Sequence, residues 1–314
     1  MIQASDYQFL RSAQVIVDDI LVADIQGGNV EKSLAVDFHV IKHVKLEPHS
    51  TTVTVYNLNQ QNREKLTRRL EEAKKLSFEQ RKELKAGQVT LRAGYESAEL
   101  ISIADIRTIE HKPQKGGGFV TYIQAFDGRV SWDGAFAKET LAAGGADLST
   151  LKSTLAALAK LNEGAELNDA FQEALPDYQL QKGSNGMKNG GVVFGPVRDH
   201  FDNMFEALGL RGWIDNGKLV VAPKNAPKKG IAVSLSYTRG LIEAQSKDDQ
   251  FYEITALLNP KIEVGGQIQL RDENEKPIGP GTFRADHVEY IGSTMGNDWL
   301  STALLRPSAI GGVL

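Results

Sequence analysis

Apolar residues recur at every second position in much of the first third of this sequence. In residues 14–18 and 34–40 this alternation gives a strand one face to bury and one to expose. The β-branched run 51–56 has Val53 and Val55 on one face and threonines on the other, and it stops at the turn signal Asn57-Leu58-Asn59. We therefore expect a sheet here, with further strands at 88–95, 100–109 and 119–126.

A helical period interrupts this sheet pattern. Residues 59–85 contain no Gly or Pro, and their leucines fall near helical spacing among many charges. The segment predicts an amphipathic helix, or a helical hairpin broken near Ser77, that is inserted between two strands. Asn59 or Asn62 would cap its start, and Gly87 would end it.

The middle of the chain predicts helices and one tight hairpin. Leucines at helical spacing predict a helix over 148–161, and the Gly- and Asn-rich stretch 181–191 predicts a mobile loop. Pro196 fits the first turn of a helix over 197–208 that Gly209 ends. Asn216-Gly217 fits the type I′ turn of a hairpin over 212–221. A linker over 224–230 precedes predicted strands at 231–237, 250–258, 267–270, 281–291 and 299–305.

Length and composition set the scale of the fold. A chain of 314 residues suggests about two domains. The pattern predicts an α+β, mainly β class, with two antiparallel β domains, a helical insertion and a helical and hairpin middle segment. We place the domains at 1–130 (with the insertion at 59–86), 131–223 and 224–314. No fixed-period repeat stands out.

Composition also excludes several kinds of function. The absence of cysteine removes disulfides, thiol nucleophiles and Cys-ligated metal sites. The 36 basic and 40 acidic residues leave a net charge of −4, so no overall basic field attracts nucleic acid. No apolar run is long enough for a membrane span, and the start lacks the pattern of a secretory signal.

Catalytic signatures are missing as well. The sequence has no Walker loop, HExxH, GxSxG or dinucleotide fingerprint, and Gly116-Gly117-Gly118 fits a hairpin loop better than a phosphate loop. His39 and His43 would share a helix face only if their segment were helical, but it has the pattern of a strand. We therefore expect structural or exposed histidines at 39, 43, 49, 111, 200 and 287. No catalytic, cofactor-binding or metal-ligating residue is assigned, and no cofactor is expected.

Other polar and aromatic clusters have simple structural explanations. The carboxylate pairs 18–19, 71–72 and 248–249 are typical of solvated faces, as are the acidic residues at 163, 166, 169 and 173. Trp132, Trp213 and Trp299 are too scattered for a sugar-stacking platform and are expected to be structural. The lysines at 224, 228 and 229 lack the interleaved aromatic residues of a nucleic-acid surface, so we expect them to solvate a linker.

Several strings in a fixed order resemble one family. The strand 51–56 ends in Tyr-Asn-Leu at 56–58, and after the helical segment another strand ends in Ala-Gly-Tyr at 93–95. They are followed by FVTYIQAFDG (119–128), FEALGLRGWIDNGKLVVAP (205–223), LLNP (257–260), GGQI (265–268), FRADHVEYIG (283–292) and DWLST (298–302). Together these strings resemble the baseplate hub proteins of contractile-tailed phages and related injection devices.

The resemblance implies a structural protein of the virion tail baseplate, made in the host cytoplasm. Hub proteins of this kind form homotrimers at the end of the tail tube, and each subunit contributes two tube-like β-barrel domains. Three copies then give a pseudo-sixfold ring that matches a hexameric tube and carries a trimeric central spike. The implied partners are this spike, the tail tube or a tube initiator, the tape-measure protein and baseplate wedge proteins. DNA only passes through the lumen, and no stable membrane insertion is implied.

Three expectations qualify this interpretation. The net charge predicts an acidic lumen if the acidic residues face inward. The apolar end 308–314 either docks on a neighbour or on the spike, or frays. The alternatives to a hub are a hub-associated cell-wall hydrolase, for which 141–210 is the only candidate region, and a receptor- or glycan-binding tail module.

Overall fold

Strands dominate the structure, a computed structural model that describes residues 10–27, 33–84, 86–141, 157, 162–163, 191–248 and 251–308. All but two of the strand pairings are antiparallel, which confirms the expected α+β, mainly β class. The strands of the first β-rich part are β1 (Arg11–Val17), β2 (Ile20–Ile25), β3 (Val36–His43), β4 (Ser50–Tyr56), β5 (Gln88–Tyr95), β6 (Glu99–Pro113) and β7 (Phe119–Phe126). Those of the second part are β13 (Val233–Leu235), β14 (Leu241–Asp248), β15 (Phe251–Leu257), β16 (Gln267–Arg271), β17 (Pro277–Ser293) and β18 (Trp299–Pro307).

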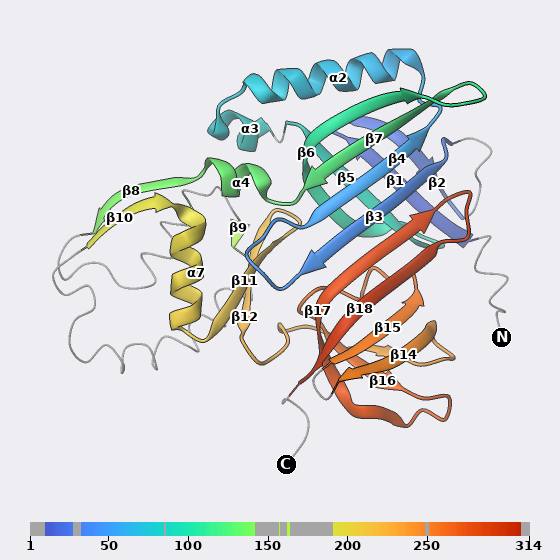
Figure 1. Ribbon diagram of the computed structural model, residues 1–314, viewed down its shortest axis with the longest axis vertical. Helices are drawn as coiled ribbons and strands as arrows, with labels where there is room; N and C mark the ends of the chain where they lie inside the picture. Colours follow the sequence, from blue (N-terminus) through green and yellow to red (C-terminus); the bar gives the residue numbers. More distant parts are fainter. Residues whose placement is uncertain are drawn as a thin grey trace.

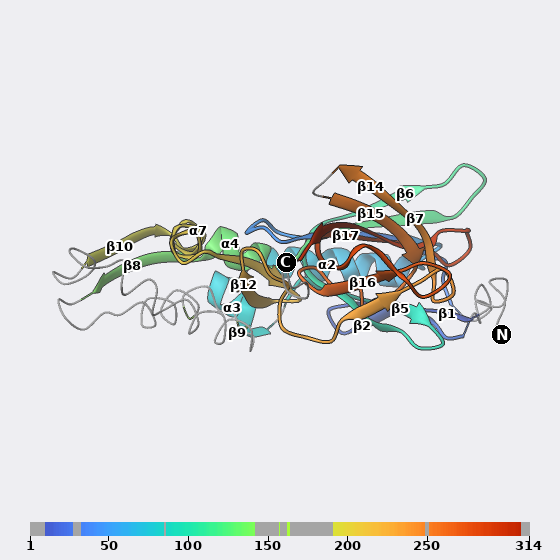
Figure 2. The same cartoon turned by 90° about the horizontal axis from the view of Figure 1, so that it is seen from below.

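Both β-rich parts contribute to one 13-stranded sheet. Its order runs β14-β15-β18-β17-β3-β4-β7-β6-β5-β1-β2, and β16 extends from β17 to β13. The first eight of these strands form what we call the wall sheet, which faces the viewer in Figure 1. The sheet folds back at β6, so that β5, β1 and β2 form a second layer behind it (Figure 2). The sequence did not predict a shared sheet, because strand partners are chosen over long distances in the chain.

The two β-rich parts repeat the same strand pairings. In the first part β3 pairs with β4, β4 with β7, β7 with β6, and β6 with β5. In the second part β14, β15, β18, β17 and β16 repeat these pairings in the same order along the chain. The long strand of each repeat carries a one-residue bulge against its neighbour, at Arg107 in β6 and at Asp286 in β17. The repeat therefore exists in topology although no sequence period marks it.

A helical hairpin closes one end of the first repeat. Helices α2 (Gln60–Lys75) and α3 (Phe78–Leu84) confirm the predicted insertion and its break near Ser77. Asn59 is the N-cap, since its side-chain oxygen accepts the N–H of Asn62 at 2.8 Å. Leu66, Leu70 and Ala73 form the buried stripe of α2, and the opposite face is charged and exposed. The insertion is thus an outer element, drawn at the top of Figure 1.

The middle segment extends to one side of the wall sheet (Figure 1). It contains α4 (Arg129–Gly134), β8 (Phe136–Leu141), β9 (Asn162–Glu163), β10 (Gly191–Pro196), α7 (Val197–Ala207), β11 (Leu210–Asp215) and β12 (Lys218–Pro223). Pro196 at the N-cap of α7 agrees with the prediction. So does the tight turn at Asn216-Gly217, where both residues have positive φ. The expected helix over 148–161 lies outside the described residues apart from Ala157, and so do most of the stretches 181–191 and 308–314.

Candidate functional site

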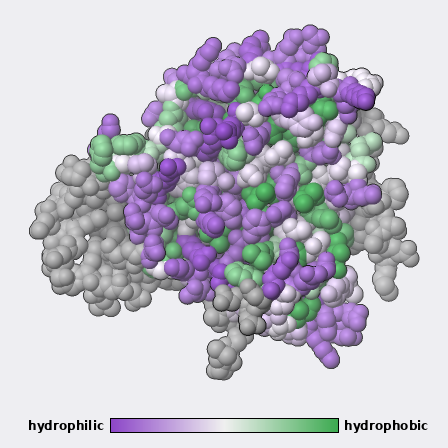
Figure 3. Space-filling model, in the orientation of Figure 1, coloured by the Kyte–Doolittle hydropathy of each residue, from purple (hydrophilic) through white to green (hydrophobic). Residues whose placement is uncertain are grey.

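The wall sheet presents one face over its eight strands on the side of the molecule drawn in Figure 3. Hydrophilic side chains spread over this face, with smaller apolar patches between them (Figure 3). Among the exposed and half-buried charged residues described on its eight strands, six are acidic and four are basic. These are Asp37, Glu99, Glu110, Glu243, Glu253 and Glu289 against Arg107, Lys112, Lys247 and Arg306. These strands therefore carry a small excess of negative charge, and the expectation of an acidic lumen stays a prediction.

The two repeats meet where β17 pairs with β3. Seven residue pairs join these strands, from His287 opposite His43 to Ser293 opposite Asp37. Buried residues of both repeats form one hydrophobic cluster behind the junction, and Phe38 contacts Trp299 edge-on with ring centroids 5.4 Å apart. Gly292 lies opposite Phe38, and a Cβ there would come within 2.2 Å of the ring. The junction is thus packed as tightly as a protein interior.

Glu289 links the strands of this junction on the wall face. Its carboxylate lies 3.1 Å from His39 Nε2 and 2.9 Å from His287 Nε2. Partial burial raises the pKa of Glu289, but the hydrogen bonds from the two histidines outweigh it, so the pKa lies below its usual value. This polar bridge therefore holds the repeats together where water reaches the sheet.

Arg11 fastens the end of the same junction. Its guanidinium donates to the carbonyls of Ser293 and Gly296 at 3.0 and 2.7 Å, and to that of Asn297 at 3.0 Å. These carbonyls belong to the last residue of β17 and to the loop between β17 and β18, so a side chain of β1 holds a connection of the second β-rich part. Burial lowers the pKa of Arg11, yet the group remains a cation at any physiological pH.

A buried group of charged residues attaches the β11–β12 hairpin to the first repeat. Lys42 on β3 donates to Asp215 Oδ1 at 2.5 Å, although both side chains are nearly inaccessible to water. Asp127, directly after β7, accepts the backbone N–H groups of Asn216 and Gly217. Asn216 in turn accepts the N–H of Ile103 at 2.9 Å through its side-chain oxygen. The hairpin turn is therefore bound by charge-assisted hydrogen bonds rather than by apolar packing alone.

Burial sets the protonation states in this group. It raises the pKa of Asp127 to about 7, with the neighbouring Asp215 as the second cause. It also lowers the pKa of the fully buried His49 to about 3, so this ring is neutral and its Nε2–H donates to the carbonyl of His43 at 2.9 Å. Burial raises the pKa of Asp215 too, but the ammonium of Lys42 outweighs it, and the pKa lies below its usual value. With Asp127 protonated below neutral pH, the charges of Lys42 and Asp215 balance.

The same group has the donor atoms of a cation site. One ligand atom each of His49, Asp127 and Asp215 lies within 4.8 Å of the others, the one such group among the described residues. Lys42 already supplies the cation there, and both oxygens of Asp127 accept backbone N–H groups. The arrangement therefore fits an internal ion pair, and the expectation of no metal site stays a prediction.

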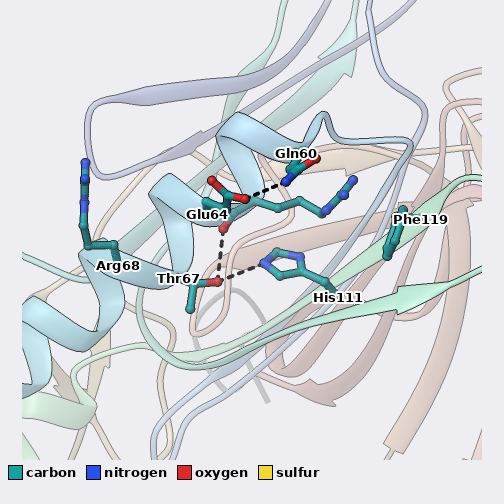
Figure 4. A pocket seen from close by; sticks show the side chains of 7 residues that line it. Gln60, Glu64, Thr67, Arg68, His111 and Phe119 are labelled. Atoms are coloured by element: carbon teal, nitrogen blue, oxygen red, sulfur yellow. Dashed lines mark hydrogen bonds between the residues drawn. The ribbon is translucent and has the colours of Figure 1, made fainter.

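An open pocket of about 630 Å³ lies between α2 and the β6–β7 hairpin. In Figure 4, Thr67 of α2 points to His111 of β6, at 3.1 Å from Nε2, and Phe119 lies on the opposite side. The other ring nitrogen of His111 lies 2.9 Å from the hydroxyl of Thr121, and Arg63 stacks 3.8 Å above the Phe119 ring. These contacts attach α2 to the β6–β7 hairpin.

The structure places most of the sequence-based candidates as expected. Gly116–Gly118 form the β6–β7 turn, and His39 and His43 lie on one face of a strand. Trp132, Trp213 and Trp299 are buried. Glu71 and Glu72 are exposed on α2, while residues 164–190 and 249–250, with three acidic candidates and Asp249, lie outside the described residues.

Three expectations need correction. Asp18 does not lie on a solvated face, because its carboxylate accepts the N–H groups of Gly87 and Gln88. Lys228 is not a solvated linker residue, since its largely buried ammonium lies 2.6 Å from Glu263. The strand expected at 231–237 shrinks to β13, because only three of its residues pair with β16. Sequence reasoning also missed the roles of His49, Asp127 and Asp215, whose partners come from separate segments.

None of the described helices is long and apolar enough to span a membrane. No curated protein sequence matches the chain. Among solved structures, a tail protein from Neisseria meningitidis MC58 aligns at a TM-score of 0.52 and 10% identity, covering 96% of this chain and 97% of that one. The 43 kDa tail protein of prophage MuSo2 from Shewanella oneidensis aligns at 0.56 and 6%, covering 94% and 96%.

A third similar structure is the E. coli c3393 protein, described as a component of the type VI secretion system with structural similarity to the T4 tail proteins gp27 and gp5. It aligns at a TM-score of 0.50 and 5% identity, covering 94% of this chain and 77% of that one. At such identities these likenesses show a shared fold. The family described as baseplate hub gp41 matches residues 20–278 of the 314, which is most of the sequence. The chain therefore belongs to the baseplate hub gp41 family, a structural component of phage tails.

Proposed function

We propose that three copies of this chain form a ring that joins the hexameric tail tube to the trimeric central spike. The observation that carries this proposal is the pair of repeats that share one wall sheet through β17 and β3. Two similar units per chain make six units in a trimer, so the ring has a near-sixfold face for the tube while keeping true threefold symmetry for the spike. The domain division at 1–130, 131–223 and 224–314 belongs to this proposal.

A closed ring of this kind has room for a channel. Each wall sheet has eight strands, so three copies contribute 24. At about 4.8 Å between strands the circumference is about 115 Å, and strand tilt widens it. Barrels with 16–18 strands already enclose an aqueous channel. A 24-stranded ring is therefore wide enough to line a conduit.

The charge of the wall face suits passage rather than binding of DNA. Affinity for duplex DNA depends on Lys and Arg groups that neutralise phosphates. Six acidic and four basic residues leave no such excess of positive charge on the strands of the wall sheet, and Arg306 is already 3.0 Å from the buried Asp286. We expect DNA to slide past this surface without adhering.

The same proposal covers the partners. The spike binds one face of the ring, the tube or its initiator the other, and the tape-measure and wedge proteins surround them. The likeness to the c3393 protein, itself described as similar to gp27 and gp5, supports such an assembly. We propose no catalytic role.

Light scattering after size-exclusion chromatography tests the trimer, and averaged electron-microscopy end views test the ring. We expect three chains per particle and six similar densities around an open centre. A chain that remains monomeric at all concentrations, alone and with its spike, would refute the proposal. Clearing of a peptidoglycan zymogram by the pure protein would refute the non-catalytic part.

A further inference from the structure

The two ends of the wall sheet are complementary strand edges. We infer that β14 of one copy pairs antiparallel with the outer half of β6 in the next copy, with Gln245 opposite Lys112. A second copy of this chain is therefore the partner of both edges. The inference rests on the proposed ring and says how the ring closes.

Both edges have only one strand neighbour in the described part of the chain. β14 is the end of the strand order and pairs with β15 alone. The first half of β6 pairs with β5 on one side and β7 on the other, but beyond Asp105 only β7 remains. Long edges that project backbone N–H and C=O groups are templates for pairing, and natural proteins cover them or pair them.

The junction inside the chain shows what such a pairing looks like. There, β17, the long strand of the second repeat, pairs with β3, the first strand of the other repeat. By the repeat, β17 corresponds to β6 and β3 to β14. An equivalent contact between copies therefore joins β6 to β14, and a head-to-tail contact that recurs through a closing rotation makes a ring.

The bulges set the register on the long strands. Arg107 and Asp286 are the bulged residues of β6 and β17. Lys112 and Ile291 each follow their bulge by five residues, so they occupy equivalent positions. Inside the chain, Ile291 lies opposite His39.

The same bulges locate the partner of Lys112. In the second repeat the residue directly after the bulge is His287, and the residues opposite it on successive strands are Leu304 on β18, Glu253 on β15 and Gln245 on β14. In the first repeat the residue directly after the bulge is Thr108, and the residues opposite it on successive strands are Gln124 on β7, Thr52 on β4 and His39 on β3. Gln245 is therefore the equivalent of His39, which places it opposite Lys112 of the next copy.

The charges along both edges are compatible with this register. Lys112 lies 2.8 Å from Glu110 on its own strand, and Lys247 pairs with Glu253. The inferred register brings Glu110 beside Lys247 and Lys112 diagonal to Glu243, so opposite charges alternate across the new seam. A shift by two residues in one direction would set Lys112 against Lys247, and in the other direction it would set Lys112 against Glu243, so the bulges rather than the charges fix the register.

Disulfide trapping tests the register, because the chain contains no cysteine of its own. The test variant carries Lys112→Cys with Gln245→Cys, both at exposed positions. The out-of-register control keeps Gln245→Cys and moves the other cysteine four residues along the same face, to Thr108→Cys. The chemical control is Ile291→Cys with His39→Cys, the equivalent pair within one chain. Directly opposed strand residues lie within disulfide reach, whereas a four-residue offset adds about 13 Å.

After oxidation, non-reducing gels should show covalent dimers and trimers for the test variant, at least tenfold more than for the Thr108 control. The chemical control should form its bond within single chains. The inferred interface would be wrong, and the proposed ring would still stand, if the test variant were a trimer by light scattering but formed no more cross-link than the Thr108 control. This outcome counts only if the chemical control reacts. A chain that stays monomeric while the chemical control reacts would overturn both.

Discussion

Replacing Asp127 by asparagine should make the free energy of unfolding depend on pH between about pH 4.5 and about pH 6. In this range the wild-type pair of Asp127 and His49 contributes no pH dependence. In the folded protein burial raises the pKa of Asp127 to about 7 and lowers that of His49 to about 3. In the unfolded chain the ordinary values are 3.8 and 6.5. Between about pH 4.5 and about pH 6, the folded pair therefore holds one proton on Asp127, and the unfolded pair holds one proton on the histidine.

Because both states of the wild-type pair bind one proton, their contributions to the pH dependence cancel. Asp127 binds its proton more tightly in the folded state, so its contribution to the free energy of unfolding falls as the pH rises toward 7. His49 binds its proton less tightly when folded, so its contribution falls as pH drops below 6.5.

Asp127→Asn leaves only the histidine, and the free energy of unfolding should then fall by about 1.4 kcal/mol for each pH unit of acidification, or about 2 kcal/mol from pH 6 to pH 4.5. His49→Gln should show the opposite slope with about the same magnitude, and the double variant should again be flat relative to wild type.

Urea titrations followed by tryptophan fluorescence measure this effect, since all three tryptophans are buried. The difference from wild type is compared at each pH, which cancels the contributions of all other groups. Gln124→Ala, at an exposed and uncharged position on β7, is the control and should run parallel to wild type. If Asp127→Asn and His49→Gln also ran parallel to wild type, the buried proton would not be where we place it.

Further substitutions test other parts of the structure. Arg11→Met removes three hydrogen bonds to loop carbonyls and should cost about 3 kcal/mol, measured by thermal unfolding against a conservative Arg11→Lys variant. Gly292→Ala places a methyl group against the Phe38 ring and should cost about 1–3 kcal/mol in the same assay; an unchanged transition would mean that the β17–β3 junction is looser than described. Val53→Asp buries an unpaired charge at a fully inaccessible position, so it should abolish folding of the first repeat and reduce the far-UV circular dichroism signal. A variant that folds and loses one activity selectively would contradict a structural role. Glu253→Lys adds positive charge to the wall face and should increase DNA retention in a gel-shift assay at low salt, while the wild type should cause none.

Local features were predictable from local sequence. The β-branched run that became β4, the break in the helical hairpin near Ser77 and the Asn216-Gly217 turn each depend on a few adjacent residues. Prediction failed at the edges of the sheet. β14 is exposed over most of its length, so it has no buried face to impose an alternating pattern, and Ile242 within it is 48% exposed.

The buried charges could not be found by spacing. Lys42, His49, Asp127 and Asp215 come from three distant parts of the chain, and only their burial together makes them one group. Their one sequence signal is that Asp127 and Asp215 end the strand strings FVTYIQAFD and LRGWID by which the family was recognised. That signal located the residues without giving their role.

The sequence by itself determined most of the strands, the inserted helices, the tight turns and the family, because residue type and spacing act over one or two turns of chain. The tertiary structure alone decided that two β-rich parts with no visible sequence repeat share one set of strand pairings, and that β17 joins β3 in one sheet. It also decided which carboxylate holds a buried proton. Strand partners and burial depend on contacts between residues far apart in the chain, and no local pattern encodes them.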